Sequence, residues 1–225
     1  MSWVTQTFSS SIGRKAIMSL TGLFLISFLT VHMSGNLLLF QNDDGLAFNA
    51  YAKFMTTNPV IKTVSYLLYT GIIVHSVWAL ILSVHNRSVR PVGYAVSKAS
   101  ANSSWNSRNM GILGTIVLVF LIIHMRSFWY EMKFGSLPLD ANGNKDLYSI
   151  VQAAFQQWWY ALLYVVAMGG LAFHLAHGFA SAFQTLGLNH RKYTPLIQKI
   201  GLAFAVIVPF VFATMPIYFY IKSLI

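Results

Sequence analysis

The sequence predicts an all-α integral membrane protein, a bundle of five transmembrane helices that forms a single domain over residues 1–225. Hydrophobic residues make up 56% of the chain and charged residues only 9%, far below the roughly 25% that is usual in soluble domains. Apolar runs long enough to cross a hydrocarbon core of roughly 30 Å recur along the chain. No linker separates these runs, so we expect one bundle.

The five spans are expected at residues 16–40, 60–85, 109–130, 158–184 and 200–222. The first apolar run is too long for a signal peptide and lacks a small-residue cleavage site, so we expect a retained span. Pro209 and Pro216 fall in the fifth span, where neighbouring helices can absorb a kink. An odd number of spans places the two ends of the chain on opposite sides of the membrane.

The connections between the spans are polar. Residues 41–59 contain a candidate amphipathic helix over 48–55, which Asn58-Pro59 would end. Residues 86–108 form an inner loop rich in Ser, Asn and Arg. Residues 131–157 form a long outer loop, in which Asp140-Ala-Asn-Gly143 is typical of a turn.

The basic residues predict the orientation. With the N-terminus inside, the inner segments hold Arg14, Lys15, Arg87, Arg90, Lys98, Arg108, Arg191, Lys192 and Lys199. The outer segments hold fewer, namely Lys53, Lys62, Arg126, Lys133, Lys145 and Lys222, together with all five acidic residues. We therefore expect a cytoplasmic N-terminus, and this bias explains the net charge of +10 better than a nucleic-acid partner does.

Four histidines fall at two depths. At about 1.5 Å per residue, His32 lies some 27 Å from Arg14 and His124 about 24 Å from Arg108, which forms an outer layer. His75 and His174 lie about 16 Å from the inner ends of their spans, which forms an inner layer. Each layer thus takes one imidazole from each of two helices, as a six-coordinate haem iron requires.

Hydrogen bonding and zinc binding account for these histidines less well. A single histidine in a membrane helix can serve as an interhelical hydrogen bond, but four histidines matched by depth favour ligation. Zinc is the poorer hypothesis, because no cysteine or intramembrane carboxylate completes a tetrahedral site. Gly22 and Gly114 each precede an outer histidine by ten residues, about 15 Å of helix, and would let a macrocycle approach the backbone near the inner layer. Close packing of helices explains a single glycine equally well.

Three histidines remain outside the two layers. His177 is three residues from His174 and is its rival as the inner ligand. His85 is expected at the inner interface, and His190 in a basic loop with Arg191 and Lys192.

Several stretches resemble one family. They are Ser19-Leu-Thr-Gly22, His32-Met-Ser-Gly-Asn36, Phe48-Asn-Ala-Tyr-Ala-Lys-Phe-Met55, Val74-His75-Ser-Val-Trp78 and Phe173-His174-Leu-Ala-His177-Gly178. Together they resemble the five-helix, di-haem cytochrome b subunit of succinate dehydrogenases and fumarate reductases, over nearly the whole chain. The resemblance implies two haem b groups, the outer one held by His32 with His124 and the inner one by His75 with His174. It favours His174 over His177 because the family's ligand precedes the glycine at 178 by four residues, and it places Ser19 at a propionate of the inner haem.

The resemblance also implies a function and partners. The chain would be a multi-pass anchor in the bacterial cytoplasmic membrane that binds a flavoprotein subunit and an iron–sulfur subunit, with a higher oligomer of the complex left open. Electrons from succinate would pass through the haems to a quinone, commonly menaquinone, in the respiratory chain and the tricarboxylic acid cycle. The chain itself lacks a flavin motif, a dicarboxylate site and any cysteine, so it would be an enzyme subunit without the succinate-oxidising site.

No catalytic residue is assigned. Tyr51, Lys53, Arg126 and Glu131 are outer candidates for contact with the quinone, which needs a hydrogen-bond donor and a path for protons. Two alternatives stay open: the di-haem anchor of a nitrate reductase or formate dehydrogenase, and a haem-free transporter whose histidines relay protons.

Overall fold

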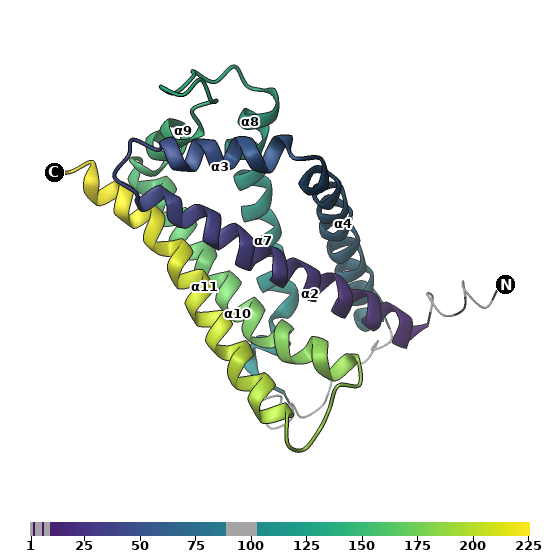
Figure 1. The fold of residues 1–225 in the computed structure, drawn as a ribbon. Helices are drawn as coiled ribbons and strands as arrows, with labels where there is room; N and C mark the ends of the chain where they lie inside the picture. Colours follow the sequence, from purple (N-terminus) through teal and green to yellow (C-terminus); the bar gives the residue numbers. More distant parts are fainter. Residues whose placement is uncertain (1, 3–5, 7–9, 89–102) are drawn as a thin grey trace.

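A computed structural model describes residues 2, 6, 10–88 and 103–225, and this part of the chain is helical without a strand (Figure 1). Five helices are long and apolar enough to cross a membrane: Ser11–Phe40, Pro59–His85, Met110–Phe134, Trp158–Thr185 and Thr194–Lys222. The predicted class and its five spans are therefore confirmed. Arg90 and Lys98, two residues of the predicted inner basic surface, lie outside the described residues.

The spanning elements are α2 (Ser11–Asn36) with the 3₁₀ turn η1 (Leu37–Phe40), α4 (Pro59–Ser88), α7 (Met110–His124) with η2 (Met125–Trp129) and α8 (Tyr130–Phe134), α10 (Trp158–Thr185) and α11 (Thr194–Lys222). Two of them begin earlier than predicted. α2 is capped by Ser10, whose hydroxyl accepts a hydrogen bond from the N–H of Gly13 at 3.0 Å. α11 begins six residues earlier because Pro195, in its first turn, is already suited to a helix start.

Two shorter helices close one end of the bundle, which we call the outer end. The predicted amphipathic helix is α3 (Leu46–Thr57), whereas α9 (Leu147–Phe155) lies in a segment predicted as loop. Asn49 of α3 is fully buried and joins the two helices. Its amide donates to Asp146 Oδ1, and its carbonyl accepts from the N–H of Tyr148, both at 3.0 Å.

The predicted turn at Asp140 is present at this end. The Asp140 carboxylate accepts hydrogen bonds at 2.9 Å from the N–H groups of Asn142 and Asn144, and Gly143 has a φ of 71°. Desolvation acts to raise the pKa of Asp140, but these hydrogen bonds outweigh it and hold that pKa below its usual value. The other end of the bundle, with the short helix α6 (Trp105–Arg108) and the turn between α10 and α11, is called the inner end.

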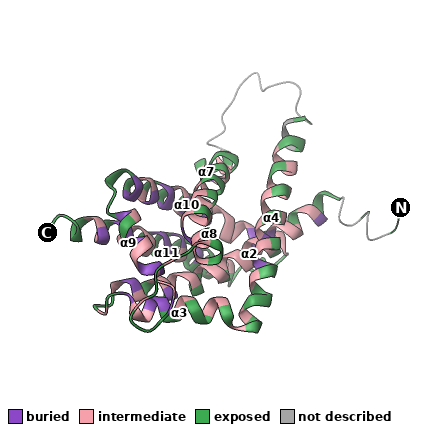
Figure 2. Ribbon diagram, turned by 90° about the horizontal axis from the view of Figure 1, so that it is seen from above, coloured by how far each residue is buried: buried purple, intermediate pink, exposed green. Residues whose placement is uncertain are grey.

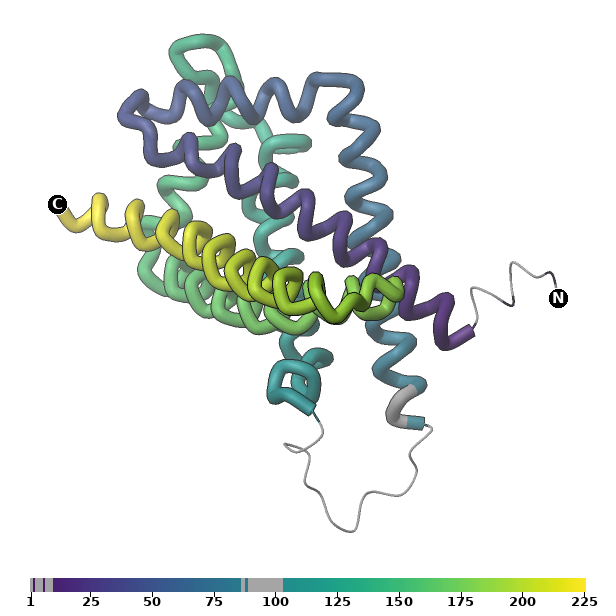
Figure 3. Tube along the Cα trace, turned by 60° about the horizontal axis from the view of Figure 1, so that its bottom comes forward, coloured from purple at the N-terminus to yellow at the C-terminus, as the bar shows by residue number. Residues whose placement is uncertain are grey.

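The packed core lies along α10 and α11. In the most apolar 18-residue stretch of each span, 39% of the residues are buried in α10 and 33% in α11. The corresponding share is 6–11% in the three other spans. Figure 2 shows this difference, with buried positions gathered on α9, α10 and α11, and Figure 3 shows α10 and α11 side by side. The remaining spans present apolar side chains outward, as a lipid-facing helix does.

Candidate haem sites

Two pairs of histidines face each other across the bundle. His32 of α2 and His124 of α7 have ring centroids 5.7 Å apart and an interplanar angle of 89°. His75 of α4 and His174 of α10 have ring centroids 6.4 Å apart and an angle of 67°. The structure thus brings together the two pairs that were expected at shared depths.

These separations suit two imidazoles on one metal ion. A metal–imidazole bond is about 2 Å long, so rings on opposite sides of one ion have centres about 6 Å apart. Two imidazoles from two helices form the ligand set of a six-coordinate haem iron. Among the described residues no group of three His, Cys, Asp or Glu side chains could hold a metal ion, so a tetrahedral zinc site has no ligand set there.

Aromatic rings enclose the outer pair. Four rings lie with centroids 5.1 to 5.7 Å from one of the two imidazoles: Phe28, Phe120, Phe128 and Phe212. Such rings pack closely at their edges and faces and keep water away from the histidines. Aromatic side chains therefore form much of the surroundings of the outer pair.

A chain of hydroxyl groups leads from the outer pair. Tyr160 donates to Ser127 Oγ at 2.6 Å, Tyr160 and Tyr164 lie 3.2 Å apart, and Tyr164 lies 3.3 Å from His124 Nδ1. Each tyrosine has one hydroxyl hydrogen, so Tyr164 donates to Tyr160 and accepts from His124 Nδ1–H. His124 Nε2 then keeps its lone pair for a metal ion.

The turn after His124 makes this chain possible. η2 is π-helical, and the N–H of Tyr130 donates to the carbonyl of Met125, five residues earlier. The wider turn directs Ser127 toward Tyr160, and it lets the indole N–H of Trp129 donate to Tyr69 on α4 at 2.8 Å. Single π turns inside α-helices are frequent at functional sites.

The inner pair has a hydroxyl partner as well. Thr21 donates to the carbonyl of Ile17 at 2.7 Å, which uses its one hydrogen, and lies 3.1 Å from His75 Nδ1. Thr21 therefore accepts from His75 Nδ1–H, and His75 Nε2 is left free.

Glycines lie beside the inner rings. A Cβ added at Gly22 would lie 3.4 Å from the His75 ring, and one at Gly114 would lie 3.7 Å from the His174 ring. Each glycine is ten residues from an outer histidine on its own helix, so the two pairs lie at different depths, as predicted. Larger side chains at these two positions would press against the imidazoles, where a bound macrocycle would need room.

Two buried polar atoms near the inner pair have no hydrogen-bond partner within the described part of the chain: His174 Nδ1 and Trp78 Nε1. Trp78 lies three residues after His75, on a neighbouring position of the same helical face. An unsatisfied buried donor costs about 1–3 kcal/mol. These atoms fit a bound group that brings acceptors of its own, as a haem with two carboxylates does, so the residues of the inner pair are compatible with haem.

The other predicted residues lie apart from the ring contacts. Ser19 is buried and donates to the carbonyl of Lys15 at 3.0 Å, so its role at a propionate stays a prediction. The structure places His174 opposite His75, and no ring contact joins His177 to another histidine among the described residues. His85 is exposed at the inner end, and His190 packs on Tyr193 in the basic turn.

The four quinone candidates do not form one cluster. Tyr51 packs against the backbone of Gly35, and burial raises its pKa. Arg126 pairs with Glu131 and stacks on Tyr130, while Lys53 is exposed on α3. No hydrogen bond or ion pair links Tyr51 or Lys53 to the Arg126–Glu131 pair in the described residues, so the structure does not select a quinone site from this set.

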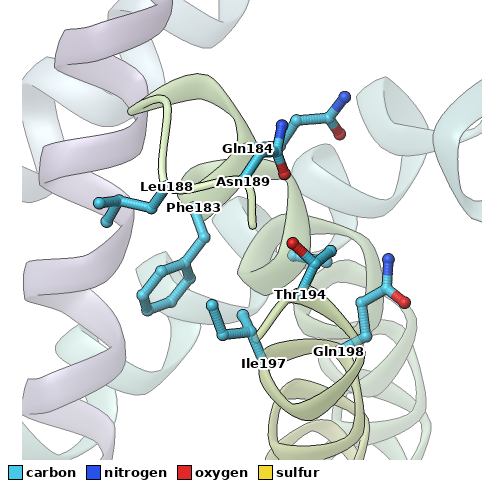
Figure 4. A pocket seen from close by; sticks show the side chains of 8 residues that line it. Phe183, Gln184, Leu188, Asn189, Thr194, Ile197 and Gln198 are labelled. Carbon is cyan, nitrogen blue, oxygen red and sulfur yellow. The ribbon is translucent and has the colours of Figure 1, made fainter. Parts of the chain in front are cut away.

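A small cavity lies at the inner end, between the end of α10 and the start of α11 (Figure 4). Its volume is about 40 Å³, which holds a water molecule or two but not a macrocycle. The amides of Gln184, Asn189 and Gln198 lie along one side, and Phe183 and Ile197 along the other. None of the four paired histidines lines this cavity.

Comparisons with protein-family models, with curated proteins and with solved structures gave no match. The function is therefore inferred from the histidine pairs and their surroundings, together with the sequence resemblance.

Proposed function

We propose that this chain is the cytochrome b membrane anchor of a succinate:quinone oxidoreductase, which relays electrons from an iron–sulfur subunit through two b haems to a quinone. One observation carries the proposal. Two histidine pairs, each from two helices, have ring separations of 5.7 and 6.4 Å at two depths of a five-span bundle. One haem above another in a bundle is an arrangement for moving electrons across a membrane.

The residues around each pair have defined tasks in this function. A haem bound at each pair would supply a one-electron carrier. Thr21 and Tyr164 hold the imidazoles of His75 and His124 so that Nε2 faces the metal position. Hydrogen bonds of this kind orient ligating histidines and raise their basicity. The phenylalanines of the outer pair keep its surroundings dry.

The inner end suits the soluble partners. Lys15, Arg191, Lys192 and Lys199 are exposed there, and a basic surface favours docking of an iron–sulfur subunit with acidic groups. We place this end in the cytoplasm of a bacterial cell and the quinone, of menaquinone type, near the outer pair. A reporter fused near residue 142 should then read external, and one fused after residue 100 should read cytoplasmic.

Purification from native membranes tests the proposal. The tagged chain should carry two haem b per polypeptide by pyridine haemochrome assay and should bring a flavoprotein and an iron–sulfur protein with it. The preparation should reduce a menaquinone analogue with succinate. Subunits of a nitrate reductase or formate dehydrogenase in the preparation would identify the alternative anchor, and protein without a haem b spectrum would favour a proton-relaying transporter.

A further inference from the structure

A cleft of about 320 Å³ opens at the outer end, away from both histidine pairs. It lies between the end of α3, the start of α4 and the segment from η2 to α8, whose positions can be followed in Figure 1. The residues that matter for its chemistry are Lys62, Tyr66, Tyr69, Trp129, Lys133 and Phe134. None of them has a part in electron relay through the histidine pairs.

Four aromatic side chains form a continuous wall of this cleft. The ring centroids of Tyr66 and Tyr69 are 6.4 Å apart, those of Tyr69 and Trp129 5.6 Å, and those of Trp129 and Phe134 5.7 Å. Tyr66 and Phe134, at the two ends of the wall, are exposed. Tyrosine and tryptophan gather at the level of lipid headgroups, where one side of the ring is apolar and the other is polar.

Two lysines line the cleft, Lys62 of α4 and Lys133 of α8. Lys62 and Lys133 come from different helices and are exposed, and neither ammonium group has a hydrogen bond or ion pair within the described residues. The other cations near them differ. Lys145 donates to the carbonyls of Met132 and Gly135, and Arg126 holds Glu131, the carboxylate nearest to Lys133 along the chain. An anion bound in this cleft would be attracted by both charges.

The smaller hydroxyl groups of the lining are already engaged. Thr56 donates to the carbonyl of Ala52 and Ser65 donates to that of Ile61, both at 2.9 Å. The groups left for a ligand are the two ammonium groups and the tyrosine hydroxyls, above a largely apolar wall. This combination fits an amphiphile with a negatively charged head. A neutral quinone needs single donors for its carbonyls and gains little from two full charges.

We propose that this cleft binds an anionic phospholipid, with its phosphate held by Lys62 and Lys133 and its first acyl carbons along the aromatic wall. Clusters of basic side chains at the membrane surface recognise anionic head groups in this way. The lipid would fill the space between α4 and the η2–α8 segment and tie together two elements that otherwise meet there through Tyr69 and Trp129.

Lipid binding to the purified complex tests the proposal. Delipidated protein is titrated with phosphatidylglycerol or with phosphatidylcholine, and bound lipid is counted by native mass spectrometry. We expect phosphatidylglycerol to be preferred, and its affinity to fall roughly 30-fold in the variant K62Q/K133Q. The variant K62R/K133R should keep the preference, and Lys222→Gln, which removes an exposed outer lysine outside the cleft, should not change it.

Three results would overturn the proposal. They are equal binding of the two lipids, an unchanged preference in K62Q/K133Q, and a loss of preference in Lys222→Gln as large as in the double variant. If K62Q/K133Q bound phosphatidylglycerol normally but lost a bound menaquinone, the cleft would be a quinone site. Inorganic phosphate at millimolar concentration should not displace the lipid; if it did so fully, the site would be one for free phosphate.

Discussion

The two histidine pairs use the same ligand type in contrasting surroundings. The outer pair is enclosed by phenylalanines and joined to a chain of hydroxyl groups, whereas the inner pair lies between glycines and beside two unsatisfied donors. The outer rings are surrounded by aromatic side chains, whereas the inner rings lie against glycines and near two donors that the described residues leave unpaired. Loss of side-chain packing should therefore harm the outer site most, and added volume should harm the inner site most.

The largest effect is expected from the histidines themselves. His75→Ala or His174→Ala should reduce the haem content from two to one per chain, because a six-coordinate iron loses one of two axial ligands. His32→Ala or His124→Ala should remove the other haem. Pyridine haemochrome assay gives the number, and the low-temperature spectrum shows which haem remains.

His177→Ala is the matched control for the inner pair, since it removes an imidazole from the same helix one turn away. It should retain both haems. A variant His177→Ala that lost the inner haem, together with a His174→Ala that kept it, would show that His177 is the ligand from the fourth span.

The glycines test whether the inner site depends on space. Leu at position 22 or 114 would put a branched side chain against the ring of His75 or His174, where even a Cβ comes within 3.7 Å. Gly22→Leu and Gly114→Leu should lose the inner haem and keep the outer one, measured by the same spectra. Gly169→Leu is the control, because nothing lies within 4 Å of a Cβ there. Two haems in both inner variants would contradict the proposed position of the macrocycle.

Asn49 tests whether the outer end supports the outer site. Asn49→Ala removes two hydrogen bonds at 3.0 Å and leaves the N–H of Tyr148 without its acceptor, which should lower the free energy of unfolding by about 2 kcal/mol. On heating, the outer haem should be released at a lower temperature, and the inner haem should change less. Asn42→Ala, at an exposed position of the same end, should have no effect. Equal loss of both haems would show that the two sites unfold together.

Much of this arrangement follows from counting along the sequence. Helix rise alone puts His32 level with His124 and puts Gly22 at the depth of the inner layer, because depth depends only on a regular backbone period. The helix α9 differs from the predicted loop, although Asp146 is a typical capping residue and accepts a hydrogen bond from the N–H of Ser149. The nine residues of α9 repeat the apolar pattern of a helix too few times for it to stand out within a long connection.

Other features depend on contacts between distant segments. The π turn of η2 brings Ser127 to Tyr160 and Trp129 to Tyr69, and no local pattern in Met125–Trp129 specifies it. Tyr164 has a weak signal in the sequence. It precedes His174 by ten residues, about 15 Å of helix, so it lies toward the outer layer. The direction of its hydroxyl depends on how the bundle packs.

The smallest effect, and the most specific, is expected from Tyr164. Its oxygen accepts from His124 Nδ1–H, and an accepting partner makes the imidazole a stronger electron donor and stabilises the oxidised iron. Tyr164→Phe removes that acceptor and keeps the ring, so the aromatic packing stays. The midpoint potential of the outer haem should rise by roughly 40 mV, which corresponds to one hydrogen bond of about 1 kcal/mol in a one-electron couple.

A spectroelectrochemical titration of the purified complex resolves the potentials of the two haems. The inner haem therefore serves as the internal reference for the outer one. The inner potential should stay unchanged, because His75 is held by Thr21 and does not touch the tyrosine chain. Tyr160→Phe should shift the outer potential by less, since the contact of Tyr164 with His124 remains. A fall of the outer potential in Tyr164→Phe would mean that Tyr164 donates to His124, and the direction of the hydroxyl chain would be reversed. An equal shift of both midpoint potentials would show instead that the substitution changes the bundle as a whole. The hydroxyl chain would then not set the potential of the outer haem selectively.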